Sequence, residues 1–363
     1  MSKIRVLQQY MDVGNIGGLR SEFLALTEST NLNNQYEFIP MILKDYHHGI
    51  NLHDIRFYYK KVKEANPDIV HIRGAGVESL NAVIGAKLAA SGKILVTVHG
   101  MYSDLVFYNV IKKWICRHII EKVIFSLSDG ISCVCKTTSE RTCFNKYKDK
   151  MLPFVYNRIP QYTQMGLAER KECRQLYDIP LSAKLGIYVG RITKEKGLSY
   201  LTEALKKLDN EWPEKLYFLV VGDGDYLCEM GNACKLLRHS KNIIFLGEQI
   251  DVRQYLLISD FFVLPSLHEN LSIAILEACA ARLPCLVTKV GGNVEIIDHN
   301  VTGIVISPAS SIDLCVGILD MCNDKVYKEL KENIGNYDFS VFSDYNVDRQ
   351  LDRVYKNLLK NVC

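Results

Sequence analysis

The sequence predicts an α/β protein made of two Rossmann-like, doubly wound parallel-sheet domains, and three observations support this fold class. The chain has 363 residues, more than one hydrophobic core usually organises, so two domains are expected. Short apolar runs rich in β-branched residues alternate with segments of helical periodicity, a pattern typical of βαβ units. Two such series occur, and residues 158–183, a polar stretch with two prolines, separate them.

Each predicted strand is a short apolar run, and most are followed by a helical pattern. In the first half we expect strands at Ile4–Leu7, Glu37–Leu43, Ile69–Ile72, Ile94–Val98 and Gly130–Val134. In the second half we expect them at Leu185–Val189, Tyr217–Val221, Ile243–Leu246, Phe261–Leu264, Pro284–Thr288 and Gly303–Val305. We expect helices at Gly18–Ser29, Asp54–Asn66, Leu80–Ser91, Ala168–Tyr177, Leu198–Leu208, Val252–Ser259, Ser272–Ala281, Ser311–Met321 and Val347–Leu359.

These elements place an N-terminal domain at residues 1–165 and a C-terminal domain at residues 166–344. The last helix, within residues 345–363, is expected to pack back on the N-terminal domain. Ligands of doubly wound sheets bind at the carboxyl ends of the strands, so we expect a cleft between the two sets of strand ends.

Charge is unevenly distributed along the chain. The net charge is only +3, but residues 1–160 hold 21 Lys and Arg against 14 Asp and Glu. The remainder holds 23 against 27. A basic first half suits an anionic partner, such as an acidic substrate or a membrane surface. A nucleic acid is disfavoured because basic and aromatic residues are not interleaved in a defined motif.

The cysteines and the N-terminus favour a cytoplasmic protein. The 12 cysteines are scattered through strand and helix patterns without a C-x-x-C pair, which indicates free thiols rather than zinc ligands or disulfides. The apolar stretch at the N-terminus is too short for the core of a signal peptide. No run approaches the ~18 apolar residues that a membrane-spanning helix needs. We therefore expect a soluble or peripheral protein.

Two features of the first half are candidates for the ligand site. Gly14, Gly17 and Gly18 follow the first strand, where backbone amides at a turn can approach an anion. A tight turn without a ligand is equally compatible with this spacing. His99 ends the fourth strand and would face the cleft, although a histidine satisfied within a loop would look the same.

The second half carries a stronger cationic signal. Gly190 and Arg191 end its first strand, and Lys196 and Gly197 open the next helix. A guanidinium fork and a point charge across such a turn suit a diphosphate. Gly222 ends the following strand, and we interpret its loop as lining a nucleotide pocket. The third glycine of a dinucleotide fingerprint is missing there, which disfavours a nicotinamide oxidoreductase.

The segment from Leu264 to Glu277 is the most informative. Glu269 follows a strand, and Asn270, Leu271 and Ser272 lead into a helix whose first amides can meet a phosphate. Glu269 is placed to accept hydrogen bonds from sugar hydroxyls, and Glu277 from the two ribose hydroxyls of a nucleotide. Glu277 lies within an apolar pattern, so we expect the buried carboxylate to have a partner.

The run from Gly190 to Glu295 resembles the C-terminal domain of retaining glycosyltransferases of family 4, which have the GT-B fold. The matching residues are Gly190-Arg191, Lys196-Gly197, Glu269-x7-Glu277, Pro284, and Gly291-Gly292 with Glu295. Two positions depart from the family pattern. Asn270 replaces a glycine, and we expect it to keep a left-handed turn; Arg282 replaces another, and we expect it at the surface end of the helix.

The resemblance implies a role for each matching residue. Arg191 and Lys196 would hold the diphosphate as leaving group, with the amides of Gly18, Leu271 and Ser272 completing the grip. His99 would contact the donor sugar, Glu269 its hydroxyls and Glu277 the ribose. No metal or other cofactor would be required, because the cationic side chains replace it. The implied activity is hexosyl transfer from a UDP- or GDP-sugar, with retention, to a glycan or lipid-linked acceptor in bacterial surface polysaccharide assembly.

Residues 108–125 form a basic, amphipathic helical pattern. Apolar positions 111, 114, 115, 119 and 123 make one stripe, and Lys112, Lys113, Arg117 and Lys122 gather on the other side. Such a helix either lies on an anionic membrane at the inner face of the cell membrane or packs its stripe into the core. Two other functions stay open: a nucleotide-sugar epimerase or hydrolase on the same fold, and a catalytically silent binding subunit.

Overall fold

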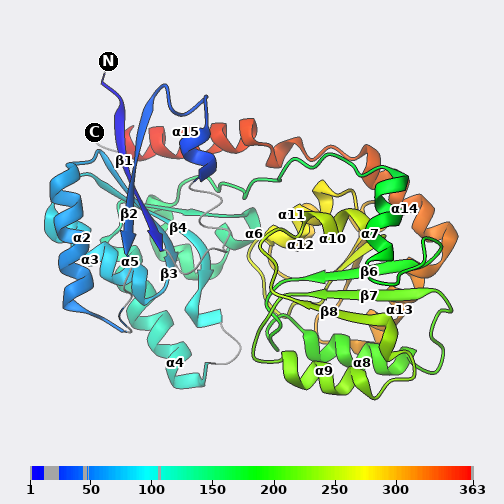
Figure 1. Cartoon of the computed structure of the whole chain (residues 1–363). Coiled ribbons are helices and arrows are strands. Elements are labelled where there is room, and N and C mark those ends of the chain that lie inside the picture. The colour runs from blue at the N-terminus through cyan, green and yellow to red at the C-terminus, as the bar shows by residue number, and fades with distance from the viewer. Residues whose placement is uncertain (1, 12–23, 44–46, 48, 105–107, 361–363) are drawn as a thin grey trace. The chain divides into compact units, whose positions relative to one another are not determined.

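The computed structural model describes residues 2–11, 24–43, 47, 49–104 and 108–360 (Figure 1). Contacts divide the chain into an N-terminal unit, Met1–Arg158 with Ser340–Cys363, and a C-terminal unit, Ile159–Phe339. Each unit has one parallel sheet with helices packed on it, which confirms the predicted α/β class. The two units divide after residues 158 and 339, a few residues before the boundaries that we expected at 165 and 344.

The sheet of the N-terminal unit has five parallel strands in the order β2-β1-β3-β4-β5. Its strands are β1 Ile4–Met11, β2 Tyr36–Leu43, β3 Ile69–Ala75, β4 Lys93–Met101 and β5 Gly130–Cys133. Its helices are α2 Leu52–Ala65, α3 Val77–Ala89, α4 Val110–Ile115, α5 Glu121–Leu127, α6 Lys136–Ser139 and α15 Asp344–Lys360. Buried side chains of α2, α3 and α5 belong to the core on one face of the sheet, with Tyr58, Val83 and Phe125 at its centre.

The C-terminal helix α15 covers the other face, where Leu351, Val354 and Leu358 join a second core (Figure 1). A buried polar network anchors it. The hydroxyl of Tyr355 lies 2.9 Å from Nδ1 of His71 and accepts a hydrogen bond from Gln8 at 2.7 Å. The Tyr355 hydroxyl and the His71 ring are thus hydrogen-bonded, which offsets the cost of burying them, whereas Gln8 Oε1 has no partner among the described residues.

The sheet of the C-terminal unit has six parallel strands in the order β11-β10-β9-β6-β7-β8. Its strands are β6 Lys184–Val189, β7 Leu216–Val221, β8 Ile243–Gly247, β9 Phe261–Leu264, β10 Cys285–Thr288 and β11 Gly303–Ile306. Its helices are α7 Leu167–Gln175, α8 Leu198–Leu208, α9 Leu227–Lys235, α10 Arg253–Ile258, α11 Ile273–Ala280, α12 Asn293–Ile296, α13 Ser311–Cys322 and α14 Asp324–Asn336. Read from β6, this is the strand order of a dinucleotide-binding Rossmann sheet.

Helix α7 contributes an arginine to the base of this sheet. Arg174 is buried at 1 % exposure, and its guanidinium lies 2.9 Å from the Asp260 carboxylate at the start of β9. Arg170 pairs with the other carboxylate oxygen at 2.7 Å, and the amide of Leu185 donates to Asp260 at 2.7 Å. Burial alone would raise the pKa of Asp260, but Arg174 and Arg170 outweigh it and hold the pKa below its ordinary value. The charged segment between the two series of strands is therefore part of the C-terminal core.

Among the residues that the structure describes, no helix combines the length and the apolar character needed to span a bilayer. The cysteines described there are free thiols, most of them buried or half-buried.

Candidate active site

The C-terminal sheet reverses its strand order between β6 and β9, which lie side by side. At such a switch point the loops after the two strands diverge and leave room for a ligand at their carboxyl ends. The loop after β6 carries Arg191 and Lys196, and the loop after β9 carries Glu269. The topology thus gathers three of the expected catalytic residues at one point.

Lys196 and Glu269 form an ion pair. The Lys196 Nζ atom lies 2.6 Å from Glu269 Oε1, and the hydroxyl of Ser266 donates to the same oxygen at 2.8 Å. Their side chains are only 19 % and 9 % exposed, so solvent screens the pair weakly. Sequence reasoning assigned Lys196 to the diphosphate and Glu269 to the sugar; the structure joins the two groups directly. A phosphate that reaches Lys196 would therefore lie beside a carboxylate already held in place.

Arg191 is the exposed cation of the site. Its side chain is 69 % exposed and lies 3.8 Å from the buried carboxylate of Glu195. The backbone beneath it is fixed, since the hydroxyl of Tyr188 donates to the Arg191 carbonyl at 2.7 Å. Tyr188 was not singled out from the sequence because it reads there as one more apolar strand residue. Arg191 can therefore turn its guanidinium towards an anion without moving its backbone.

Two glycines allow the loops at this sheet edge to pack backbone against backbone. Gly222 has a φ of +136°, and a Cβ there would overlap the carbonyl of Gly190 in the neighbouring loop. Gly291, with a φ of +49°, sits in the same way against the carbonyl of Glu269. Both positions exclude side chains on steric and conformational grounds. The glycines expected to line an anion site thus also hold the loops of β6, β7, β9 and β10 together.

Ser272 caps helix α11, accepting a hydrogen bond from the amide of Ile275 at 3.4 Å. Asn270 and Leu271 are buried just before it, and the Asn270 carbonyl accepts from the amide of Gly292 at 2.6 Å. The expected left-handed backbone at Asn270 is wrong, because the positive φ of this region falls at Gly291. Because it is Gly291 that packs closely against the backbone of residues 269 and 270, an asparagine fits at position 270.

Arg282 does not lie simply at the surface end of α11, as expected. It is half-buried with a φ of +56°, and its guanidinium donates to the carbonyls of Ile334 and Tyr337 at 3.0 and 2.9 Å. These carbonyls lie at the carboxyl end of α14, where cations are favourable. The left-handed backbone explains why a glycine is usual at this position. The arginine at this position adds hydrogen bonds to the end of α14 that a glycine side chain could not make.

Glu277 lies on α11 and differs from the expectation in one respect. No hydrogen bond or ion pair to its carboxylate is found within the described part of the chain, although we expected a partner. Burial, and then the charge of Asp251, raise its pKa from 4.5 to about 7. A half-buried carboxylate without a partner is available to hydroxyl donors of a ligand. A hollow of about 440 Å³ adjoins this region, and Asp251 and Arg253 are among its lining residues.

His99 lies inside β4, which extends beyond it to Met101. Burial, and then the charge of Arg73, lower its pKa from 6.5 to about 3, so the imidazole is neutral at pH 7. Its Nε2 atom is buried and has no hydrogen-bond partner among the described residues. The alternative of a satisfied loop histidine is thus wrong for this part of the chain. Gly14, Gly17 and Gly18 lie outside the described residues.

Two Rossmann-like sheets, with cationic and acidic groups at the switch point of the second, define the architecture of GT-B glycosyltransferases. Residues 169–340 match the family described as "Glycosyl transferases group 1", and residues 22–157 match "Glycosyltransferase Family 4". The chain belongs to this family of group 1, family 4 glycosyltransferases and is a transferase enzyme.

Several characterised proteins resemble it over most of its length. The N-acetyl-alpha-D-glucosaminyl L-malate synthase of Bacillus anthracis is 26% identical over 82% of this chain and 76% of its own. An Escherichia coli UDP-Gal:alpha-D-GlcNAc-diphosphoundecaprenol alpha-1,3-galactosyltransferase is 25% identical over 87% of this chain and 81% of its own. The structure of Anabaena HepE in complex with UDP and glucose superimposes with a TM-score of 0.78 at 14% identity, over 98% of this chain and 100% of that one.

Proposed function

We propose that the enzyme transfers a hexosyl unit from a UDP- or GDP-sugar, with retention of configuration, to a glycan or lipid-linked acceptor in bacterial surface polysaccharide assembly. The observation that carries the proposal is the half-buried Lys196–Glu269 pair at the β6/β9 switch point. A cation for a leaving diphosphate and an acceptor for sugar hydroxyls are held there within 2.6 Å of each other.

In this reaction Lys196 and Arg191 stabilise the charge that develops on the departing diphosphate. Preorganised charges of this kind act where water is excluded and need little rearrangement as the bond breaks. They also take the place of a metal ion, so we propose that transfer needs none. The amides of Leu271 and Ser272, before α11, complete the contact with phosphate.

Glu269 orients the donor sugar by accepting hydrogen bonds from its hydroxyls, and Glu277 accepts those of the ribose. The unpartnered state of Glu277 supports this assignment. The neutral imidazole of His99 has a free Nε2 atom among the described residues and contacts the donor sugar. A neutral ring at this position can donate or accept a hydrogen bond without adding charge.

The names of the relatives support a UDP-linked donor. The E. coli relative is named for UDP-Gal as donor and for a diphosphoundecaprenol acceptor, and HepE was solved with UDP-glucose. These names also support a lipid-linked saccharide as acceptor. Thermal shift with a panel of nucleoside diphosphates and nucleotide sugars tests the donor, because a ligand that binds the folded state raises Tm.

Transfer itself is tested with the donor that stabilises the protein and with saccharide and undecaprenyl-diphosphate acceptors. The anomeric configuration of the product, read by NMR, distinguishes retention from inversion. Free sugar or an epimerised nucleotide formed without acceptor would identify a hydrolase or epimerase instead. Binding without any turnover would identify a silent binding subunit.

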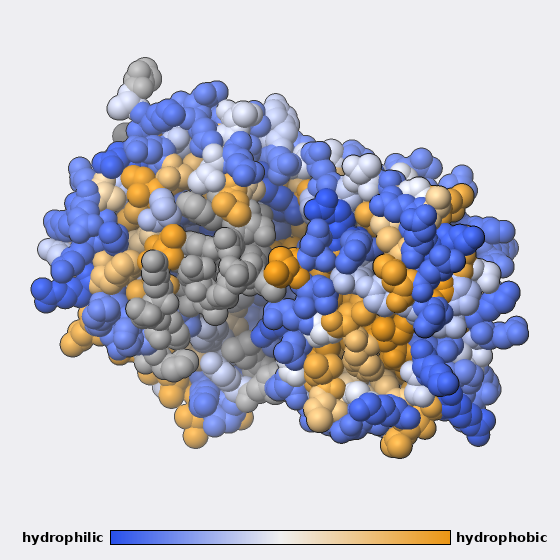
Figure 2. Space-filling view, viewed as in Figure 1, coloured by the Kyte–Doolittle hydropathy of each residue, from blue (hydrophilic) through white to orange (hydrophobic). Residues whose placement is uncertain are grey.

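We further propose that α4 docks the enzyme on an anionic membrane at the inner face of the cell membrane. None of its residues is buried, and Ile111, Trp114 and Ile115 are 70%, 55% and 39% exposed. The buried stripe is instead formed by Cys116, Ile120 and Ile124, beyond α4. Of the apolar stripe expected from the sequence, Ile111, Trp114, Ile115 and Ile119 are therefore exposed, whereas Val123 packs against the core. Packing of α4 itself into the core is wrong. Figure 2 shows apolar atoms gathered at the end of the N-terminal unit where α4 lies.

Positive charges on and just after α4 favour an anionic lipid surface. Lys112 and Arg117 are exposed beside the apolar stripe, so lipid head groups with negative charge would be attracted while the apolar side chains enter the interface. Vesicle flotation should show binding that depends on anionic lipid and weakens with salt. The double variant Ile111→Ser, Trp114→Ser should lose this binding. The control Leu236→Ser, which changes a leucine on the other unit that is even more exposed, at 87%, should keep it. Equal flotation of both variants would refute membrane docking by α4.

A further inference from the structure

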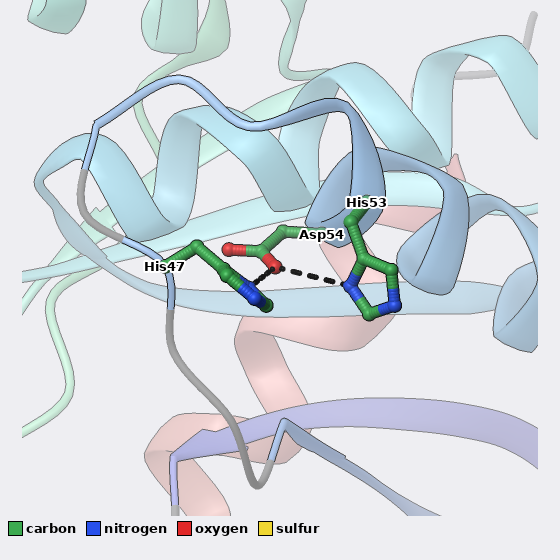
Figure 3. Close-up of side chains that lie close together, drawn as sticks. All are labelled: His47, His53 and Asp54. Atoms are coloured by element: carbon green, nitrogen blue, oxygen red, sulfur yellow. Dashed lines mark hydrogen bonds and ion pairs between the residues drawn. The ribbon is translucent and has the colours of Figure 1, made fainter.

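A cluster of three potential metal ligands lies at the start of α2 in the N-terminal unit (Figure 3). His47 precedes the helix, and His53 and Asp54 lie in its first turn. One ligand atom from each residue lies within 4.8 Å of the others. Among the described residues this is the one such group of three His, Cys, Asp or Glu ligands.

The distances between the ligand atoms suit a small divalent ion. Nδ1 of His53 lies 3.6 Å from Asp54 Oδ1, and Nδ1 of His47 lies 2.8 Å from the same oxygen. Metal–ligand bonds of about 2.0–2.1 Å in a tetrahedral site separate the ligand atoms by roughly 3.4 Å. The His53 distance already matches, and the His47 hydrogen bond needs to open by about 0.6 Å. Figure 3 shows both imidazole rings turned towards the carboxylate.

Asp54 is incompletely hydrogen-bonded within the described part of the chain. Its side chain is fully buried, and Oδ2 has no hydrogen-bond partner among the described residues. Oδ1 meets only the two imidazoles there. A charge buried in this way is costly unless it is paired or bound to a metal.

The turn that carries His53 and Asp54 is held by hydrogen bonds. Asn51 caps α2 by accepting hydrogen bonds from the amides of His53 and Asp54 at 2.8 and 3.4 Å. The buried Asn81 of α3 holds this turn from the other side, accepting from the Asn51 amide at 3.3 Å and donating to the Gly49 carbonyl at 3.1 Å. Ligands on a fixed backbone need little ordering when an ion binds.

We propose that His47, His53 and Asp54 bind a divalent transition metal of the zinc type. Two imidazole nitrogens and one carboxylate oxygen are ligands that this class of ion accepts, and water completes the coordination because both histidines are exposed. The ion neutralises Asp54 and ties the segment after β2 to the start of α2. None of its three ligands is among the residues to which the transfer chemistry is assigned.

Cobalt titration of the chelator-treated full chain tests this site, because Co²⁺ reports its ligands by absorption. We expect one ion per chain, with visible bands but without the near-ultraviolet thiolate-to-cobalt band that a site among the 12 cysteines would give. Zn²⁺ should compete for it and raise Tm.

His53→Ala should weaken binding at least about 100-fold, since loss of outer-shell partners alone costs about 10–100-fold. The matched control is His239→Ala, which removes an imidazole that also contacts an aspartate, at 3.1 Å from Asp209, in the other unit. It should bind like the wild type. Absence of binding, equal affinity in His53→Ala, or a thiolate band that survives in His53→Ala would each overturn the proposal. These readouts involve no transferase activity, so they stand apart from the proposed function.

Discussion

Replacing Glu277 with glutamine separates what this carboxylate does for nucleotide binding from what it does to folding. Burial, and then Asp251, raise the pKa of Glu277 from 4.5 to about 7. As the pH rises through this window, the unfolded chain releases the proton while the folded chain keeps it. The free energy of unfolding of the wild type therefore falls as the pH rises from 4.5 to about 7, and it stays lower above pH 7.

The difference of about 2.5 pKa units corresponds to about 3 kcal/mol at 25 °C. Glutamine keeps the shape but cannot ionise, so Glu277→Gln should be more stable than the wild type above pH 7 by up to about 3 kcal/mol. For a unit of this size that is roughly 6–12 °C in Tm. Below about pH 4.5 the two proteins should melt together, because both side chains are then neutral.

The affinity of Glu277→Gln for the nucleotide should fall, although its stability rises. Hydrogen bonds to a charged acceptor are worth about 1.5–3 kcal/mol, so Glu277→Gln should raise the Kd of the bound nucleoside diphosphate about 10- to 100-fold. Wild-type affinity should also fall as the pH drops below about 7, where Glu277 is protonated. Thermal melts from pH 4 to 8 and titration calorimetry measure both effects.

The exposed Glu329 of α14 provides a matched control, since Glu329→Gln should change neither property. The reasoning fails if Glu277→Gln melts like the wild type at pH 8, or if it binds the nucleotide equally well.

Three further predictions concern the same unit. Arg191→Ala should leave Tm within about 2 °C, because the side chain is 69% exposed, and should lower kcat about 100- to 1,000-fold; near-normal turnover would exclude its leaving-group role. Lys196→Ala should lower the rate similarly but also destabilise by about 1.5–3 kcal/mol, since it removes the charged hydrogen bond to half-buried Glu269 and leaves it only the bond from Ser266; the double variant with Glu269→Gln should recover stability but not turnover, and recovery of both would contradict the assignment. Asp260→Asn should remove a contribution that is present above its ordinary pKa of 3.8 and lost as the pH falls through the lower folded value; an unchanged acid-unfolding profile would show that the Arg174 pair adds no pH dependence.

The strands could be predicted well because parallel, doubly covered strands are continuous apolar runs. β9, Phe261–Leu264, and α8, Leu198–Leu208, begin and end where the sequence placed them. Helix α14 was not predicted. Only Leu330 and Ile334 of its 13 residues are buried, so its apolar signal is weak.

Periodicity predicted helical structure at residues 108–125, where the structure has helical segments over residues 110–127, but it did not predict which side is buried. The expected stripe through Ile111 and Trp114 is exposed, and Cys116, Ile120 and Ile124 face the core instead. A π-helical segment, Cys116–Ile120, lies between α4 and α5 and shifts the register of the two faces. An apolar stripe alone cannot show whether core or solvent lies beside it.

For the site, residue types and spacing singled out Arg191, Lys196 and Glu269, because each follows a strand or precedes a helix at the sheet edge, and Glu277, because it interrupts an apolar helical pattern. Which of these side chains pair with one another could not be predicted from the sequence. Lys196 and Glu269 are 73 residues apart and meet only because β6 and β9 are neighbours. The His47–His53–Asp54 cluster escaped sequence reasoning, since its spacing matches no familiar metal motif.

The sequence by itself determined the α/β class, the two series of strands and the residue types at the strand ends, because these depend on local periodicity and on turn chemistry. Tertiary structure alone decided which charges are paired, which carboxylate is left without a partner and which glycines hold neighbouring loops together. Those properties depend on burial and on contacts between distant segments. Local sequence does not encode the dielectric surroundings of a side chain, and these surroundings set the strength of its charge interactions.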